Sequence, residues 1–122
     1  MLHTIRFVSA TPVLASLDIE RSVEFFCSKL GFTALHVEQG VYGVIMRSGV
    51  SLHFWPCRER HIAENTSCRL RVEGIAALYA LCVPLDIVHP NAPLSDKPWG
   101  SREFGILDPD GNLVTFAEFA DE

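Results

Sequence analysis

The sequence of 122 residues has no apolar run that approaches the roughly 20 residues needed to span a bilayer. Its opening residues, Met1 to Phe7, lack the basic stretch and apolar core of a secretory signal peptide. No low-complexity tract interrupts the chain, and its length suits one domain that buries its own core. We therefore expect a cytoplasmic, single-domain protein that does not associate with membranes.

Cysteine is scarce and shows no pairing pattern. None of the four cysteines, Cys27, Cys57, Cys68 and Cys82, lies in the Cys-x-x-Cys spacing that is typical of metal and redox motifs. Cys27 and Cys82 fall on the apolar faces of predicted helices. We interpret the cysteines as reduced packing residues.

Positive charge is also in short supply. The chain has 10 Lys and Arg against 15 Asp and Glu, a formal net charge of −5. This balance disfavours a nucleic-acid partner and favours a cationic one.

The first half contains the pattern of one strand, one helix and three strands. Ala10–Ala15 is apolar, and Pro12 near its start suits an edge or first strand. Asp18 is placed to cap a helix that Gly31 ends. The apolar stripe of this helix is Ile19, Val23, Phe26, Cys27 and Leu30. The strands predicted after it are Thr33–Glu38, Val41–Arg47 and Val50–Trp55.

The second half repeats this order after a polar stretch, Pro56–Asn65, that we predict to be a linker. The last two strands form a β-hairpin around Asp108-Pro109-Asp110-Gly111, whose residue types favour a tight turn. The predicted elements are strand Ser67–Val72, a helix marked by Ile75, Leu78, Tyr79 and Cys82, and strands Asp86–His89, Glu103–Leu107 and Leu113–Phe119.

The same order of elements thus occurs twice, in residues of about 10–56 and 66–120. Neither half could bury a sheet face alone. We expect an α+β fold in which two βαβββ modules form curled mixed sheets around a cleft, with helices on the outer faces. Ligand chemistry should then lie on the inner faces.

Trp99 lies between Pro98 and Gly100 in a segment predicted to be a loop. A large aromatic side chain has no core to fill there, so this position favours a role in binding.

Two motifs together resemble the vicinal oxygen chelate superfamily, which includes glyoxalase I, extradiol dioxygenases and bleomycin-resistance proteins. The opening motif is Pro12-Val13-Leu14 with Asp18-Ile19-Glu20-Arg21-Ser22-Val23-Glu24-Phe25-Phe26 and Leu30-Gly31-Phe32, and the closing motif is Asp108-Pro109-Asp110-Gly111-Asn112. Three segments are most similar to the bleomycin-resistance proteins: Thr11-Pro12-Val13-Leu14, Glu64-Asn65-Thr66, and Lys97-Pro98-Trp99-Gly100-Ser101-Arg102-Glu103-Phe104. The resemblance covers the chain from about Ala10 to Phe119.

This resemblance implies a homodimer that exchanges N-terminal strands around Pro12 and forms two clefts with contributions from both subunits. In that family the planar bithiazole of the drug stacks on aromatic side chains, and its cationic tail meets acidic groups. The implied activity is stoichiometric sequestration of bleomycin-class glycopeptides, without chemistry and without a cofactor.

The resemblance also assigns ligand-binding positions. Trp99 matches the loop tryptophan of the family, and an exposed aromatic offers contact area at low entropic cost. On the strand that ends at Trp55, alternation puts Ser51, His53 and Trp55 on the more polar face, which should line the cleft. The complete candidate set is Trp99, Tyr42, His36, Trp55, His53, Glu64, Gly111 and Asn112.

The metal-ligand positions of the superfamily's enzymes fall on Thr11, His53, Cys68 and Thr115. Two threonines do not supply the imidazole or anionic donors of a tight site. We therefore expect no catalytic metal. His53 and Cys68 are left as weak candidates for binding a soft metal ion. The alternative for His53 is a polar residue that faces the cleft, and the alternative for Cys68 is a strand residue packed in the core.

Two alternatives stay open at this point. The first is a divergent metal-dependent lyase, isomerase or thiol transferase that uses His53 and Cys68. The second is a binder of an unrelated metabolite, because fold does not fix function. Arg69 stands where the family often has an aromatic, and a cation there would oppose a cationic drug. Glu38, Glu64 and Glu118 are either acidic contacts of the ligand or solvated surface charges.

Overall fold

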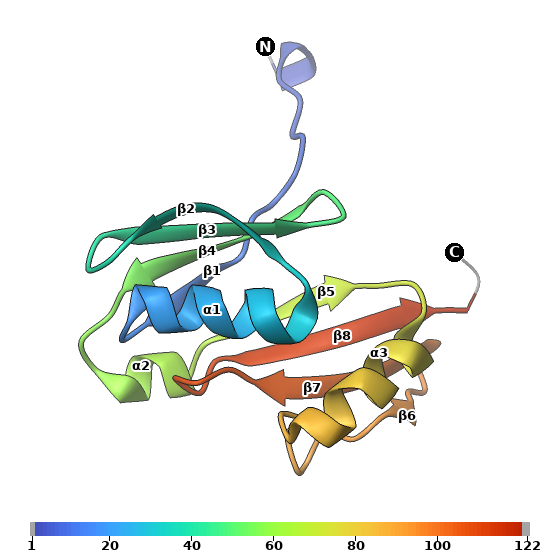
Figure 1. Cartoon of the computed structure of the whole chain (residues 1–122). Helices are drawn as coiled ribbons and strands as arrows, with labels where there is room; N and C mark the ends of the chain where they lie inside the picture. The colour runs from blue at the N-terminus through green and yellow to red at the C-terminus, as the bar shows by residue number, and fades with distance from the viewer. Residues whose placement is uncertain (1, 121–122) are drawn as a thin grey trace.

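The computed structural model describes residues 2–120 and contains two similar α+β modules (Figure 1). The first module consists of β1 (Val13–Ser16), α1 (Ile19–Leu30), β2 (Thr33–Glu38), β3 (Tyr42–Arg47) and β4 (Val50–Pro56). A short helix, α2 (Arg60–Glu64), joins it to the second module, which consists of β5 (Ser67–Arg71), α3 (Ile75–Cys82), β6 (Ser95–Asp96), β7 (Ser101–Leu107) and β8 (Leu113–Phe119). The 3₁₀ turns η1 (Leu2–Thr4) and η2 (Val83–Leu85) complete the elements.

Each module builds one four-stranded mixed sheet. The strand orders are β1-β4-β3-β2 and β5-β8-β7-β6, with a parallel pair at one edge and antiparallel pairs elsewhere. Because parallel strands cannot be joined by a tight turn, the chain passes from β1 to β4 through α1, β2 and β3, and from β5 to β8 through α3, β6 and β7. The predicted fold class of two βαβββ modules with mixed sheets is confirmed.

The helix α1 begins and ends where the sequence predicts. The Asp18 side chain accepts a hydrogen bond of 3.1 Å from the Arg21 amide and caps the first turn. Gly31 has a φ of 72°, and its left-handed conformation closes the last turn. The fully buried Phe26 packs against Phe54 of the first sheet, with ring centroids 5.5 Å apart. The helix therefore covers one face of this sheet.

The structure of two segments differs from the prediction. The stretch Pro56–Asn65 is not a plain linker, because α2 forms within it and buries Ala63 against Ala15. Asp86–His89 is not a strand, since it makes only the isolated bridge between Val88 and Ile106. The edge strand of the second sheet is instead the two-residue β6.

Ahead of β1, the chain forms an extended arm that leaves the body of the molecule (Figure 1). Its apolar side chains lie in solvent, with Ile5 58%, Phe7 95% and Val8 80% exposed. Within residues 2–120, no helix is both long and apolar enough to cross a bilayer.

Candidate functional site

Each sheet has one face packed on a helix and one face that is more open. In the second sheet, Phe104, Val114 and Phe116 point toward α3 and are buried. Alternation then directs the neighbouring residues to the other side. We call this side the open face of the second sheet; the residues that register places on it are Ser67, Arg69, Arg71, Ser101, Glu103, Gly105, Leu107, Leu113, Thr115, Ala117 and Phe119.

A single carboxylate, Glu103, organises the open face of the second sheet. Its two oxygens accept hydrogen bonds of 3.1 and 2.7 Å from the two terminal nitrogens of Arg69. The indole Nε1 of Trp99 donates to the same Oε2 oxygen at 2.9 Å, and the Ser101 hydroxyl donates to it as well. Glu103 is only 4% exposed. Three separate segments, β5, the loop before β7 and β7 itself, are thus tied to one group.

The hydrogen bonds from Arg69 lower the pKa of Glu103 to about 2, with further lowering from Ser101 and Trp99 and an opposing effect of burial. Glu103 is therefore ionised at neutral pH and forms a bidentate ion pair with Arg69. This pairing corrects the expectation that Arg69 presents an uncompensated cation, because its charge is balanced at close range.

Trp99 lies in a tight turn and is 61% exposed. The Lys97 amide donates to the Ser101 carbonyl at 2.7 Å, and the Gly100 amide donates to the Lys97 carbonyl at 3.1 Å. Gly100 has a φ of 97°, which side-chain-bearing residues rarely adopt. The turn and the bond to Glu103 hold the indole edge while much of the ring remains in solvent. This arrangement can stack a flat ligand.

The first sheet has a second aromatic cluster. We define its open face by the residues that alternate with the buried Leu14, Ile45, Leu52 and Phe54: Val13, His36, Glu38, Tyr42, Val44, Met46, Ser51, His53 and Trp55. The Tyr42 hydroxyl lies 2.9 Å from Nδ1 of His53, and the two rings meet edge to face. The structure thus brings Tyr42, His53, His36 and Trp55 to one face of the first sheet.

Nearby on β2, Nε2 of His36 lies 3.3 Å from a carboxylate oxygen of Glu38, which gives an ion pair when the imidazole is protonated. Trp55 is exposed at the end of β4. Both residues are accessible to a ligand that covers this face.

Cys68 does not join the other candidate metal ligand, His53. It pairs with the buried Val114 and packs against the core on the α3 side. Burial raises the pKa of its thiol to about 11, so the thiolate that metals prefer is disfavoured. Among residues 2–120, no group of three or more His, Cys, Asp or Glu side chains is placed to hold a metal ion. These residues do not fit a metal centre of the superfamily type.

Asn112 is corrected from a groove residue to a structural link between the modules. It is fully buried, and its amide donates to the Ala15 carbonyl at 2.7 Å while its oxygen accepts from the Ala15 amide at 3.2 Å. The side chain therefore occupies the place of a neighbouring strand at the free edge of β1. Nearby, Asp110 accepts from the Leu17 amide at 3.1 Å and pairs with Arg21.

Gly111 and Glu64 also lie at this junction. A Cβ atom at Gly111 would come within 2.8 Å of the Glu64 side chain, and the φ of Gly111 is 95°. Glu64 itself pairs with Arg60 of α2 at 3.1 Å. The contacts of these two residues are therefore with each other and with α2. Glu118 is likewise engaged, because it accepts hydrogen bonds from the first amides of α3.

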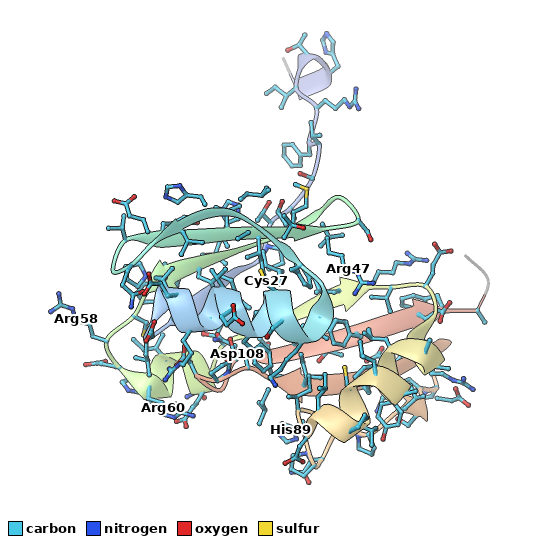
Figure 2. All side chains as sticks on the ribbon, viewed as in Figure 1. Cys27, Arg47, Arg58, Arg60, His89 and Asp108 are labelled. Carbon is cyan, nitrogen blue, oxygen red and sulfur yellow. The ribbon has the colours of Figure 1, made fainter. Side chains whose placement is uncertain are left out.

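Two carboxyls with opposite shifts predict how stability depends on pH. Asp108 is buried and lies within the body of the molecule (Figure 2). Burial raises the pKa of Asp108 to about 6 from an ordinary 3.8. Its contribution to the free energy of unfolding therefore increases as the pH falls from about 6 to about 4. The pKa of Glu103 lies below its ordinary 4.5. Its stabilisation is complete above about pH 4.5 and is lost as the pH falls toward 2.

We expect the summed contribution of these two groups to pass through a maximum at about pH 4 to 5. Urea unfolding at fixed protein concentration, across the range from acid to neutral pH, measures this. Asp108→Asn should reduce the gain in the free energy of unfolding as the pH falls from about 6 to about 4. Glu103→Gln should reduce the loss as the pH falls from about 4.5 toward 2. Unchanged pH profiles in both variants would contradict these assignments.

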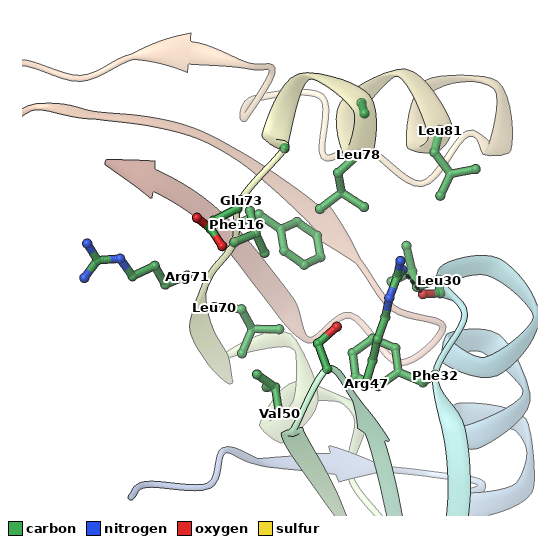
Figure 3. A pocket seen from close by; sticks show the side chains of 14 residues that line it. Leu30, Phe32, Arg47, Val50, Leu70, Arg71, Glu73, Leu78, Leu81 and Phe116 are labelled. Atoms are coloured by element: carbon green, nitrogen blue, oxygen red, sulfur yellow. Dashed lines mark hydrogen bonds between the residues drawn. The ribbon is translucent and has the colours of Figure 1, made fainter. Parts of the chain in front are cut away.

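A separate cavity of about 850 Å³ lies between the modules (Figure 3). Leu78 and Phe116 line it, together with other mostly apolar side chains from the end of α1, the β3–β4 turn and the end of β5. Arg47, on its rim, donates to the Leu30 carbonyl at 2.5 Å. Trp99 takes no part in its lining, so we distinguish this cavity from the aromatic clusters.

Sequence reasoning missed Glu103 and Ser101 as members of the site. The signal lies in alternation along β7, which puts both residues opposite the buried Phe104 and Ile106. Their convergence with Arg69 depends on the register of β5, β8 and β7, which the sequence does not specify by itself.

Comparisons with known proteins show relatives of this chain in sequence and in fold. No protein-family model matches the chain. The bleomycin resistance proteins of Geobacillus stearothermophilus and Staphylococcus aureus are each 39% identical to it, over an alignment that covers 89% of this chain and 95% of the relative.

Solved structures show the same fold. The bleomycin-binding protein from bleomycin-producing Streptomyces verticillus, in complex with copper(II)-bleomycin, matches with a TM-score of 0.81 and 28% identity, and the match covers 92% of this chain and 96% of that one. The bleomycin resistance determinant encoded on transposon Tn5 matches in fold with a TM-score of 0.79 and 24% identity, over 93% of this chain and 99% of that one.

Proposed function

Since the chain belongs to the bleomycin resistance protein family, we propose that it binds a bleomycin-class glycopeptide and withholds the drug by stoichiometric sequestration. The drug leaves the protein chemically unchanged. Sequestration protects DNA only in the compartment that holds DNA, so the proposal requires a cytoplasmic protein.

The exposed ring of Trp99 carries this proposal. A planar bithiazole requires a flat partner whose orientation is fixed before binding, because ordering a mobile side chain costs affinity. Trp99 meets this requirement through its bond to Glu103 and its hydrogen-bonded turn. The cluster of Tyr42, His53 and Trp55 offers a second aromatic surface for the same class of ligand.

Protection of DNA in vitro tests the proposal. Plasmid is incubated with iron-loaded bleomycin and increasing amounts of protein, and strand cleavage is followed on a gel. We expect cleavage to stop when the protein reaches about one subunit per drug molecule. Mass spectrometry of drug released by denaturation should show an unchanged mass. Protection at far below this ratio with a modified drug would identify an enzyme instead.

The proposal includes a homodimer with exchanged N-terminal strands. The arm with Ile5, Phe7 and Val8 exposes apolar side chains that isolated soluble chains rarely leave in water. Pro12 lies between the arm and β1 and restricts the direction of the backbone. A second copy that receives this arm would cover these side chains and bring the two open faces of different subunits together.

Removal of the arm tests the dimer. We expect a variant that lacks residues 2–9 to sediment as a monomer at concentrations where the full chain sediments as a dimer. It should also bind bleomycin at least tenfold more weakly, because each cleft would lose the partner's surface. Phe7→Ser with Val8→Ser is the milder control and should weaken the dimer without shortening the chain. A full-length chain that sediments as a monomer would rule out this part of the proposal.

A further inference from the structure

A nearly buried carboxylate on an open sheet face is costly, because burial removes it from water. The residue opposite Glu103 in the register of β8 is Ala117, so packing alone would accept an apolar side chain at this place. Within residues 2–120, the hydrogen bonds of the Glu103 carboxylate come from Arg69, Trp99 and Ser101, which contribute to the face itself. The charge of Glu103 therefore organises the open face of the second sheet and is not required for packing of the core.

The partner of this carboxylate is a cation within reach of any ligand on Trp99. Arg69 and Trp99 donate to the same Oε2 oxygen of Glu103, at 2.7 and 2.9 Å. The Arg69 side chain is 55% exposed, whereas that of Glu103 is 5% exposed. If the carboxylate were neutral, the exposed guanidinium would repel an approaching cation. The ion pair offsets the charge of Arg69 next to Trp99. Arg71, the other arginine that β5 directs to this face, lies over the ring of Phe119, 4.9 Å from its centroid.

We propose that Glu103 sets the charge selectivity of the Trp99 surface: it cancels the charge of Arg69 and fixes the indole, so that ligands with a planar group and a cationic tail are admitted. This inference rests on the proposed function, because it concerns the same ligand. It adds the residue pair that decides which charge on that ligand is tolerated.

The test compares two ligands: bleomycin, which has a cationic tail, and bleomycinic acid, which carries a terminal carboxylate instead. Titrations follow tryptophan fluorescence in the Trp55→Phe background, so that Trp99 is the only tryptophan that contributes to the signal. We expect Glu103→Gln to weaken binding of the cationic drug by about tenfold and binding of the acid by much less. The difference between the two effects should shrink at high salt. Equal weakening of both ligands at all salt concentrations would show a merely structural role.

Arg69→Gln provides the matched variant with the opposite sign. It removes the exposed cation and leaves Glu103 with Trp99 and Ser101 as donors, so the ratio of affinities for the cationic drug over the acid should rise severalfold. The double variant Glu103→Gln with Arg69→Gln should return this ratio to the wild-type value. If Glu103→Gln does not fold, Arg69→Gln decides alone, and an unchanged ratio in it would overturn the proposal.

A readout without ligand separates this inference from the proposed function. Time-resolved anisotropy of Trp99 should gain a fast component in Glu103→Gln, because the indole loses its fixed acceptor. If wild-type protein binds neither ligand, the proposed function fails, while the anisotropy still shows whether Glu103 orients the ring. If wild-type protein binds but the ratios do not change, only the selectivity is wrong.

Discussion

Trp99→Ala should weaken bleomycin binding by about 2 to 3 kcal/mol, which is roughly 30- to 150-fold. Stacked aromatic side chains in the centre of a binding surface commonly contribute this much. Most of the Trp99 ring is exposed, so the main cost to the free energy of unfolding should be the lost hydrogen bond to Glu103, about 1 to 2 kcal/mol. Isothermal calorimetry gives the affinity, and urea unfolding gives the stability.

Two control variants make this result specific. Trp99→Phe keeps a flat ring but loses the Nε1 donor to Glu103, so it should retain more affinity than Trp99→Ala. Trp55→Phe keeps an aromatic ring at the end of β4 and should weaken binding less than Trp99→Ala does. Wild-type affinity in Trp99→Ala would remove the loop tryptophan from the binding surface and direct attention to Tyr42 and His53.

Asn112→Ala should lower the free energy of unfolding by about 2 to 4 kcal/mol. The substitution leaves both backbone groups of Ala15 without partners in a fully buried place, and it removes the donor to Asp108 at 2.8 Å. Because these bonds join the second module to β1, the effect should extend to both modules. Hydrogen exchange of the Ala15 amide should increase with the loss of stability.

Asn65→Ala is the matched control, since its amide donates to the His61 carbonyl at an exposed position. It should change the free energy of unfolding by less than about 1 kcal/mol. Equal effects of the two substitutions would contradict the role of Asn112 as a buried link.

The first module could be predicted almost completely from its sequence. Asp18 and Gly31 mark both ends of α1, and Thr33–Glu38 is the strand as predicted. These signals are local, because caps and alternation depend on neighbouring residues. Strong local signals of this kind are missing in Arg60–Glu64, which becomes helical where Ala63 packs against β1.

The candidate site was less predictable, because it depends on long-range register. The exposed position of Trp99 follows from its place between Pro98 and Gly100. In contrast, the ion pair of Arg69 with Glu103 joins residues far apart in the chain and needs the alignment of three strands. The same limit explains Cys68, whose side of the sheet follows from its pairing with Val114 rather than from its residue type.

A calorimetric titration of chelator-treated protein with bleomycin tests the central claim most directly. The proposal predicts saturable binding of about one drug molecule per subunit, with no slow heat of reaction after each injection. Absence of heat and of any Trp99 fluorescence change at high micromolar drug would contradict sequestration of bleomycin by this chain.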